Sequence, residues 1–209
     1  INREKMAVVL QEVCGRPYGN RFYPSFSGVG RSLNFYPIGN EKPEDGVVNV
    51  ALGLGKYIVD GGQTLRFSPK YPQKVLQTST TELALRDTQN EVLALDLNPE
   101  AFRTSTDDAV NIRHFDLSQV SKLRNSKYIT STWDRENERI SDSPFVEGHK
   151  IITFNSILKY NTFPLAEILV ELLEIAEREM LKEKARNNED VIVCGDDNVI
   201  RHIPAKNFF

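Results

Sequence analysis

The amino-acid sequence predicts an α+β fold, in which a mixed or antiparallel sheet packs against helices. Residues 6–13 form a Val-rich, nearly unbroken apolar run, which is typical of a strand buried on both faces. Residues 91–97 alternate between polar and apolar side chains, which indicates an edge or hairpin strand. From Thr162 onward, apolar side chains recur at helical spacing and predict one long amphipathic helix.

The first third of the chain alternates between turn chemistry and short strand candidates. Residues 14–27 are dense in Gly, Pro and aromatic side chains, so we expect an ordered loop there. Residues 28–36 would return as a second strand, followed by a turn over 37–46. Residues 47–60 allow a helix or a strand in each half, and 61–68 a short strand.

The middle of the chain, about 75–148, is expected to be an irregular insertion, with a short helix near 117–123. Residues 149–154 are a strand candidate that leads toward the long helix. That helix has Thr162 as its expected cap and Pro164 in its first turn, where a missing N–H is tolerated.

One apolar stripe of this helix is expected to be buried. Its members are Leu165, Ile168, Leu169, Leu172 and Ala176. The helix would end at Asn187 and Asn188, and residues 191–193 would form a last strand before a turn at 196–198. We expect two parts, a main lobe over 1–180 and a C-terminal tail over 181–209.

Composition restricts the class of protein. The 209 residues are 40% hydrophobic and 26% charged with a net charge of -3, so no general affinity for nucleic acid or anionic lipid is predicted. No apolar run approaches the roughly 18 residues needed to cross a bilayer, and we see no signal peptide. Two distant cysteines, Cys14 and Cys194, are typical of reduced thiols, so we predict a cytoplasmic location. Because Ile1 precedes what resembles an interior strand, we expect a fragment or a processed piece of a larger protein.

The first candidate site is the polar end of the opening strand, Gln11, Glu12 and Val13. Backbone N–H and C=O groups at such an edge match the donor and acceptor of an adenine ring, and Gln11 or Glu12 would accept from its amine. The alternative is that these residues simply end a core strand.

The second candidate is the turn Gly53-Leu54-Gly55-Lys56. Glycines let backbone amides approach phosphate oxygens, and a lysine adds a positive charge. The spacing is neither the full phosphate loop nor a dinucleotide fingerprint, so a plain turn is the alternative.

The third candidate is Arg31, whose planar fork would reach a phosphate or a carboxylate. Pairing with a surface acid is the alternative. We predict no metal ligands, because the three histidines (His114, His149 and His202) lack ligand spacing. The paired acids at 107–108 and 196–197 are typical of solvated turns.

Three segments resemble the nucleotide-binding domain of pyruvate phosphate dikinase and phosphoenolpyruvate synthase. Residues 8–13, Val-Val-Leu-Gln-Glu-Val, are similar to its Val-x-x-Gln-x-Met/Val strand. Residues 27–37 are similar to its Ser-Gly-Val-x-Phe-Thr-x-Asn-Pro strand, and residues 48–61 to its Gly-Leu-Gly-Glu-x-Val-Val-x-Gly segment. The three occur in the family's order within about 60 residues.

The resemblance implies one lobe of an ATP-grasp fold, which closes on ATP and Mg²⁺. In that family the domain moves a phosphoryl group from ATP to a histidine of another domain, and phosphoenolpyruvate is then made from pyruvate. Gln11 and the backbone at Glu12 and Val13 would hold adenine, and the turn from Gly53 to Lys56 would lie near the phosphates. Catalysis in such sites is mainly positioning and charge neutralisation.

The sequence also departs from the family. Lys56 stands where the family usually has Glu, the lobe with the phosphate-binding Lys and Arg is absent, and 181–209 do not match. We therefore expect this chain alone to be inactive and to bind ATP weakly at most. The alternatives are a non-catalytic binding or assembly module, or a related phosphotransferase whose acceptor is an antibiotic or a glucan. Exposed apolar surface at the ends would favour self-association.

Overall fold

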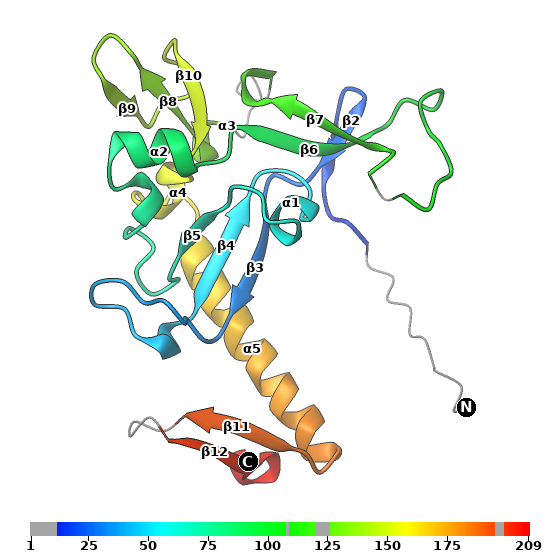
Figure 1. The fold of residues 1–209 in the computed structure, drawn as a ribbon, viewed down its shortest axis with the longest axis vertical. Coiled ribbons are helices and arrows are strands. Elements are labelled where there is room, and N and C mark those ends of the chain that lie inside the picture. Colours follow the sequence, from blue (N-terminus) through cyan, green and yellow to red (C-terminus); the bar gives the residue numbers. More distant parts are fainter. Residues whose placement is uncertain (1–11, 108, 120–125, 195–198) are drawn as a thin grey trace.

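The computed structural model describes residues 12–107, 109–119, 126–194 and 199–209. It confirms the α+β class, with antiparallel sheets and one long helix that runs out of the main body (Figure 1). The expected opening strand at 6–13 falls almost entirely outside the described residues, and its last two residues, Glu12 and Val13, are exposed and irregular.

The first sheet has the order β3-β4-β5. Its strands are β3 (Ser27–Arg31), β4 (Val47–Ala51) and β5 (Leu65–Phe67). The central strand β4 is Val-rich and buries Val48 and Val50 almost completely, as β-branched side chains do between two neighbours. The 3₁₀ helix η1 (Pro43–Asp45) precedes β4, and the single-turn helix α1 (Lys56–Val59) follows it. Each half of residues 47–60 thus takes one of the two expected forms.

A second sheet has the order β1-β2-β6-β7. Its strands are β1 (Arg16–Tyr18), β2 (Arg21–Tyr23), β6 (Glu91–Asp96) and β7 (Ile112–Asp116). The expectation of a loop over 14–27 was wrong, because the segment contains the β1–β2 hairpin. Gly19, with a φ of 64°, closes its two-residue turn. The strand expected at 91–97 is confirmed, but β6 lies inside the sheet and not at its edge.

The third sheet has the order β10-β8-β9, and short helices surround it. Its strands are β8 (Thr130–Asp134), β9 (Arg139–Ser141) and β10 (His149–Ile152). The helices are η2 (Leu76–Thr78), α2 (Thr81–Asp87), η3 (Leu117–Gln119), α3 (Ser126–Ile129) and α4 (Asn155–Leu158). The region from about 75 to 148, expected to be irregular, therefore contains mostly regular elements. The strand predicted at 149–154 is present.

The side chain of Gln89 joins these sheets at their centre. Its amide oxygen accepts from Leu52 N (2.7 Å), and its amide nitrogen donates to the carbonyls of Leu52 (2.7 Å) and Glu91 (2.8 Å). Its backbone carbonyl accepts from Ile152 N at 3.4 Å. Gln89 is 2% exposed, so the end of β4, the start of β6 and the end of β10 meet at one buried residue.

The main hydrophobic core lies among these three sheets. Its fully buried side chains include Phe67, Phe154, Leu52, Val92, Ile152 and Leu165. Because these come from β5, β6, β10, the loops beside β4 and β10, and the start of the long helix, the three small sheets share one core.

The long helix α5 (Leu165–Arg186) confirms the strongest element predicted from the sequence. It ends with Asn187 as its C-cap, as expected. Thr162 does not cap its start, because the Thr162 hydroxyl donates to the carbonyl of Ser156 at 2.8 Å, and Pro164 occupies the N-cap position.

The buried stripe of α5 differs from the expected one. Leu165 is buried, and Leu169 and Leu173 pack against the core, whereas Ile168 and Leu172 are 37% and 54% exposed. The contacting residues recur every fourth position because the helix meets the body along one narrow line. Leu173 lies over Gly30 of β3, where an added Cβ would come within 2.9 Å of the leucine side chain.

The last strand expected at 191–193 is confirmed and belongs to a hairpin at the far end of α5 (Figure 1). Its strands are β11 (Asp190–Cys194) and β12 (Ile200–Pro204), followed by η4 (Ala205–Phe208). The turn expected at 196–198 lies outside the described residues. Ala205 is buried, and its N–H donates to the carbonyl of Glu189 (3.1 Å), which fixes the hairpin to the helix end.

Among the residues that the structure describes, none of the helices combines the length and the apolar character needed to cross a membrane.

Replacing Gln89 with Leu is expected to lower the free energy of unfolding by about 2–4 kcal/mol, because both backbone groups of Leu52 would lose their buried partner. Chemical denaturation measures the loss. The same change at Gln73, an exposed glutamine, is the control and is expected to cost less than about 0.5 kcal/mol. Equal effects of the two substitutions would contradict the central role of Gln89.

Leu173→Ala is expected to lower the free energy of unfolding by about 1–2 kcal/mol, less than the usual cost at a fully buried leucine because Leu173 is only partly buried. Leu172→Ala, on the exposed side of the same turn, is expected to change it by less than about 0.5 kcal/mol. Thermal unfolding of both variants distinguishes the observed stripe from the one expected from the sequence, which would reverse the order.

Candidate functional site

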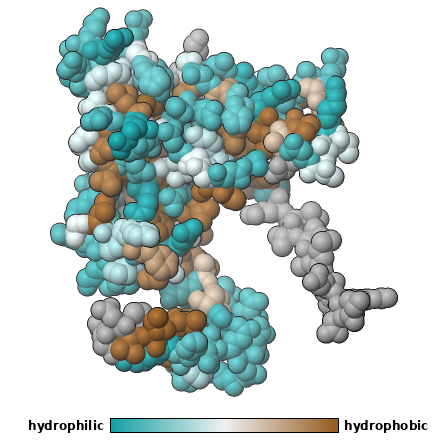
Figure 2. Space-filling view, in the orientation of Figure 1, coloured by the Kyte–Doolittle hydropathy of each residue, from teal (hydrophilic) through white to brown (hydrophobic). Residues whose placement is uncertain are grey.

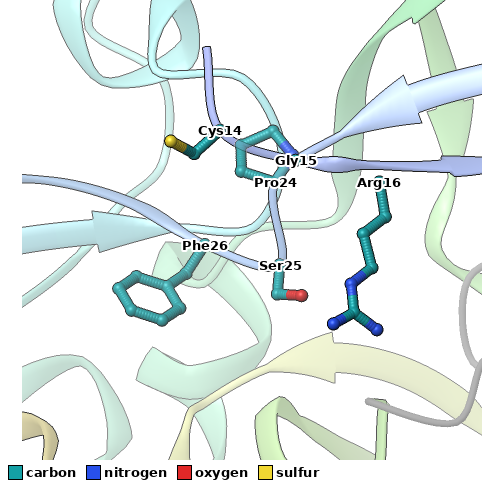
Figure 3. Close-up of a pocket in the computed structure, with 6 residues that line it drawn as sticks. All are labelled: Cys14, Gly15, Arg16, Pro24, Ser25 and Phe26. Carbon is teal, nitrogen blue, oxygen red and sulfur yellow. The ribbon is translucent and has the colours of Figure 1, made fainter. Parts of the chain in front are cut away.

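The described part of the chain has a hollow of about 250 Å³ where the N-terminal segment meets the loop between β2 and β3. Its lining comprises Cys14, Gly15, Arg16, Pro24, Ser25 and Phe26 (Figure 3). The lining residues therefore include apolar rings as well as a hydroxyl, a thiol and a guanidinium side chain. Cys14 is exposed and carries a free thiol.

Strand pairing fixes the two walls of the hollow. Arg16 pairs with Tyr23 in the β1–β2 ladder, so the residues before β1 lie against those after β2. A Cβ on Gly15 would come within 2.9 Å of the Phe22 ring and of the Tyr23 backbone, so glycine permits this close approach. Tyr23 is 2% exposed and stacks on Tyr18 with ring centroids 4.5 Å apart.

The glycine turn predicted from the sequence lies beside this hollow. The hydroxyl of Ser27, the residue after Phe26, donates to the carbonyl of Gly53 at 2.7 Å. A Cβ on Gly55 would lie 3.7 Å from the Ser27 Cβ. Ser27 therefore connects the turn to the residues that line the hollow.

The two glycines of the turn have different roles. Gly53 has a φ of 95°, and an added Cβ would lie 2.7 Å from the Leu93 carbonyl oxygen. The backbone of Gly53 forms a bridge to Leu93, and Leu54 N donates to the Leu93 carbonyl (3.1 Å), so Gly53 docks the turn on β6. Gly55 has ordinary helical dihedrals and room for a Cβ. Of these two glycines, only Gly55 could carry a side chain without a clash.

The other predicted site residues do not all gather at one place. Glu12 and Val13 are exposed and lead directly into Cys14, at the edge of the hollow, whereas Gln11 lies outside the described residues. Lys56 forms an ion pair with Asp60 at 2.8 Å. Arg31 pairs with Val47 at the opposite end of the β3–β4 ladder from Ala51, roughly 13 Å along the strand from Ser27, so it is not gathered at the glycine turn.

Sequence reasoning did not assign Arg16, Ser25 and Phe26 to a site. Arg16 and Phe26 belong to an alternation of arginines and aromatic residues, for which a packed aromatic loop is the favoured interpretation over a nucleic-acid surface. The signal was the density of Gly, Pro and aromatic residues in 14–27, which indicated order but not a hollow. The chain folds there into a hairpin and a return loop, which bring residues 14–16 and 24–26 to one place.

Across residues 12–107, 109–119, 126–194 and 199–209, no three potential metal-ligating side chains gather into one cluster. His114 Nδ1 lies 3.2 Å from a Glu91 carboxylate oxygen on the neighbouring strand. The Asp107 carboxylate accepts from Ala109 N at 2.9 Å, the geometry of a local turn.

Comparison with family models matches residues 164–208 to a domain of unknown function, DUF8506. The matched segment comprises all of α5, the terminal hairpin and η4, and does not include the hollow or the glycine turn. No curated protein matches the chain. No solved structure matches it either.

Gly53→Ala is expected to lower the free energy of unfolding by about 2–4 kcal/mol, because the new Cβ meets the β6 backbone and the φ is unfavourable for alanine. Gly55→Ala, two residues away, is expected to change it by less than about 1 kcal/mol. Thermal or chemical denaturation tests the pair. A stable Gly53→Ala variant would contradict the docking role of that glycine.

Proposed function

We propose that this chain forms the adenine side of an ATP site in a phosphotransferase resembling phosphoenolpyruvate synthase and pyruvate phosphate dikinase. The phosphoryl acceptor would be a histidine of another domain, and pyruvate the substrate processed afterwards. The observation that carries the proposal is the Ser27 contact, which connects the hollow at the end of the N-terminal segment with the glycine turn.

The placement of the three family-like segments supports this proposal. The segment 8–13 leads into the wall of the hollow, the segment 27–37 begins with β3, and the segment 48–61 includes most of β4 and all of α1. Because β3 and β4 are paired with Ser27 opposite Ala51, the second and third segments are neighbours. Two of the three family-like segments thus lie side by side, and the described end of the first, Glu12 and Val13, leads into Cys14 of the hollow.

The chemistry of the lining suits part of a nucleotide. Phe26 offers an exposed apolar face for a flat ring, and binding sites of small molecules are typically apolar with a few polar groups. Gly55 leaves room for a phosphate to approach the backbone at the start of α1. The hollow is smaller than a complete site, which fits a chain that supplies one wall.

We propose no Mg²⁺ ligands in this chain, because the described residues bring no ligand cluster together. We assign no step of phosphoryl transfer to Mg²⁺ bound by this chain. Lys56, where the family usually has Glu, is engaged by Asp60 and so provides no acidic ligand there. We therefore expect no ATP turnover by this chain alone.

An acceptor other than pyruvate, such as an antibiotic or a glucan, would fit the same segments.

A second candidate function, a non-catalytic assembly module, is favoured by the apolar surface outside the hollow. Ile168, Leu172 and Ile175 are exposed on α5, and Ile192 and Ile200 on the hairpin are 66% and 67% exposed. Figure 2 shows a brown apolar patch over this hairpin. Light scattering distinguishes the candidates: concentration-dependent dimers without nucleotide binding would favour assembly, and ATP binding by a monomer would favour the ATP site.

ATP is expected to bind the chain weakly, with a Kd on the order of 1 mM, which corresponds to about 4 kcal/mol. Gln11→Ala and Gly55→Ala are each expected to weaken binding roughly fivefold, through loss of an adenine contact and obstruction of a phosphate contact respectively. Ligand-observed NMR titration measures both.

Gln73→Ala serves as the control for this titration, since Gln73 is exposed and lies beside Lys159, remote in sequence from the three family-like segments. Its ATP affinity is expected to equal that of the unaltered chain. Affinity unchanged in both Gln11→Ala and Gly55→Ala, or no ATP signal from the unaltered chain, would end the proposal.

A further inference from the structure

Arg16 is the cationic side chain of the hollow, and none of the described acidic residues pairs with it there. None of the carboxylates in the described ranges forms an ion pair with Arg16, and the hollow itself is lined by no acidic residue. A guanidinium that faces a concave space without a counter-ion is suited to an anionic ligand, because its planar fork matches a phosphate or carboxylate with two parallel hydrogen bonds.

Other cations of the same region are already engaged. The Arg21 guanidinium lies over the Phe115 ring, 4.6 Å from its centroid. Lys56 pairs with Asp60, and Arg66 donates to Asn34 Oδ1 at 2.5 Å. Each of these side chains has a partner, whereas none is found for the Arg16 guanidinium among the described residues.

The position of Arg16 is fixed by the sheet. It is the first residue of β1 and pairs with the buried Tyr23, while Gly15 before it packs closely on β2. A charged group on a strand is held more precisely than one on a loop. Figure 3 shows the Arg16 side chain and the Phe26 ring extending in the same direction on either side of Ser25.

We propose that Arg16 binds the phosphate groups of a nucleotide whose base lies against Phe26. Phe26 is partly exposed, and an aromatic face of this kind stacks on a flat base. This inference rests on the proposed nucleotide site and changes it at one point: the phosphates lie on Arg16, and not at the turn from Gly53 to Lys56. The ligand spans the hollow, with its neutral end on Phe26 and its anionic end on Arg16.

The experiment compares adenosine, AMP and ATP by ligand-observed NMR on the unaltered chain, Arg16→Gln and Arg16→Lys. The unaltered chain is expected to bind ATP roughly tenfold more tightly than adenosine. Arg16→Gln is expected to remove that preference and to leave adenosine affinity unchanged. Arg16→Lys keeps the charge without the fork, so part of the preference is expected to remain.

Arg113→Gln is the matched control, because it removes the same charge from an exposed arginine of the same sheet, at β7. Its preference for ATP is expected to equal that of the unaltered chain. Thermal unfolding checks that each variant is folded, and Arg16→Lys decides the matter should Arg16→Gln fail to fold.

The outcomes separate the two proposals. If the unaltered chain binds ATP and Arg16→Gln keeps the tenfold preference, the role of Arg16 is overturned and the nucleotide site stands. If the unaltered chain binds neither ATP nor adenosine, both proposals fall. An equal loss in Arg113→Gln would show that overall charge, and not Arg16, attracts the phosphates.

Discussion

The structure depends on one buried amide, that of Gln89. Three small antiparallel sheets meet around it and share one hydrophobic core. The Gln89 side chain satisfies both backbone groups of Leu52, just after β4, and its own carbonyl receives the N–H at the end of β10. The Gln89 amide pairs with backbone groups that a neighbouring strand would otherwise pair. The shared core can therefore close without leaving these buried backbone groups unpaired.

The candidate site follows from that junction. Leu52 is held by Gln89, and the next residue, Gly53, docks on Leu93 of β6. The carbonyl of Gly53 then faces Ser27, which places the glycine turn beside the hollow. The geometry of the proposed nucleotide site is therefore set by packing between two sheets, in which Gly53 itself takes part.

The sequence predicted the elements whose signals are local. The strand at β6 and the end of α5 at Arg186 come from alternation, helix formers and a capping Asn, all within a few residues of one another. Helical periodicity did not reveal which face of α5 meets the body, because Leu173 and Leu172 are equally apolar and only the position of β3 distinguishes them. Arg16 was missed for a similar reason: its neighbours in the hollow come from residues 24–26, which only the hairpin brings near.

The length of α5 has a mechanical consequence. The helix has 22 residues, and its last side chain packed on the body, Leu173, lies about 20 Å from the end that carries the hairpin. A tilt of about 10° at Leu173 would carry that end through roughly 3 Å, by simple leverage over this length. Small rearrangements of the core around β3 would thus produce larger displacements of the terminal hairpin than of the body itself.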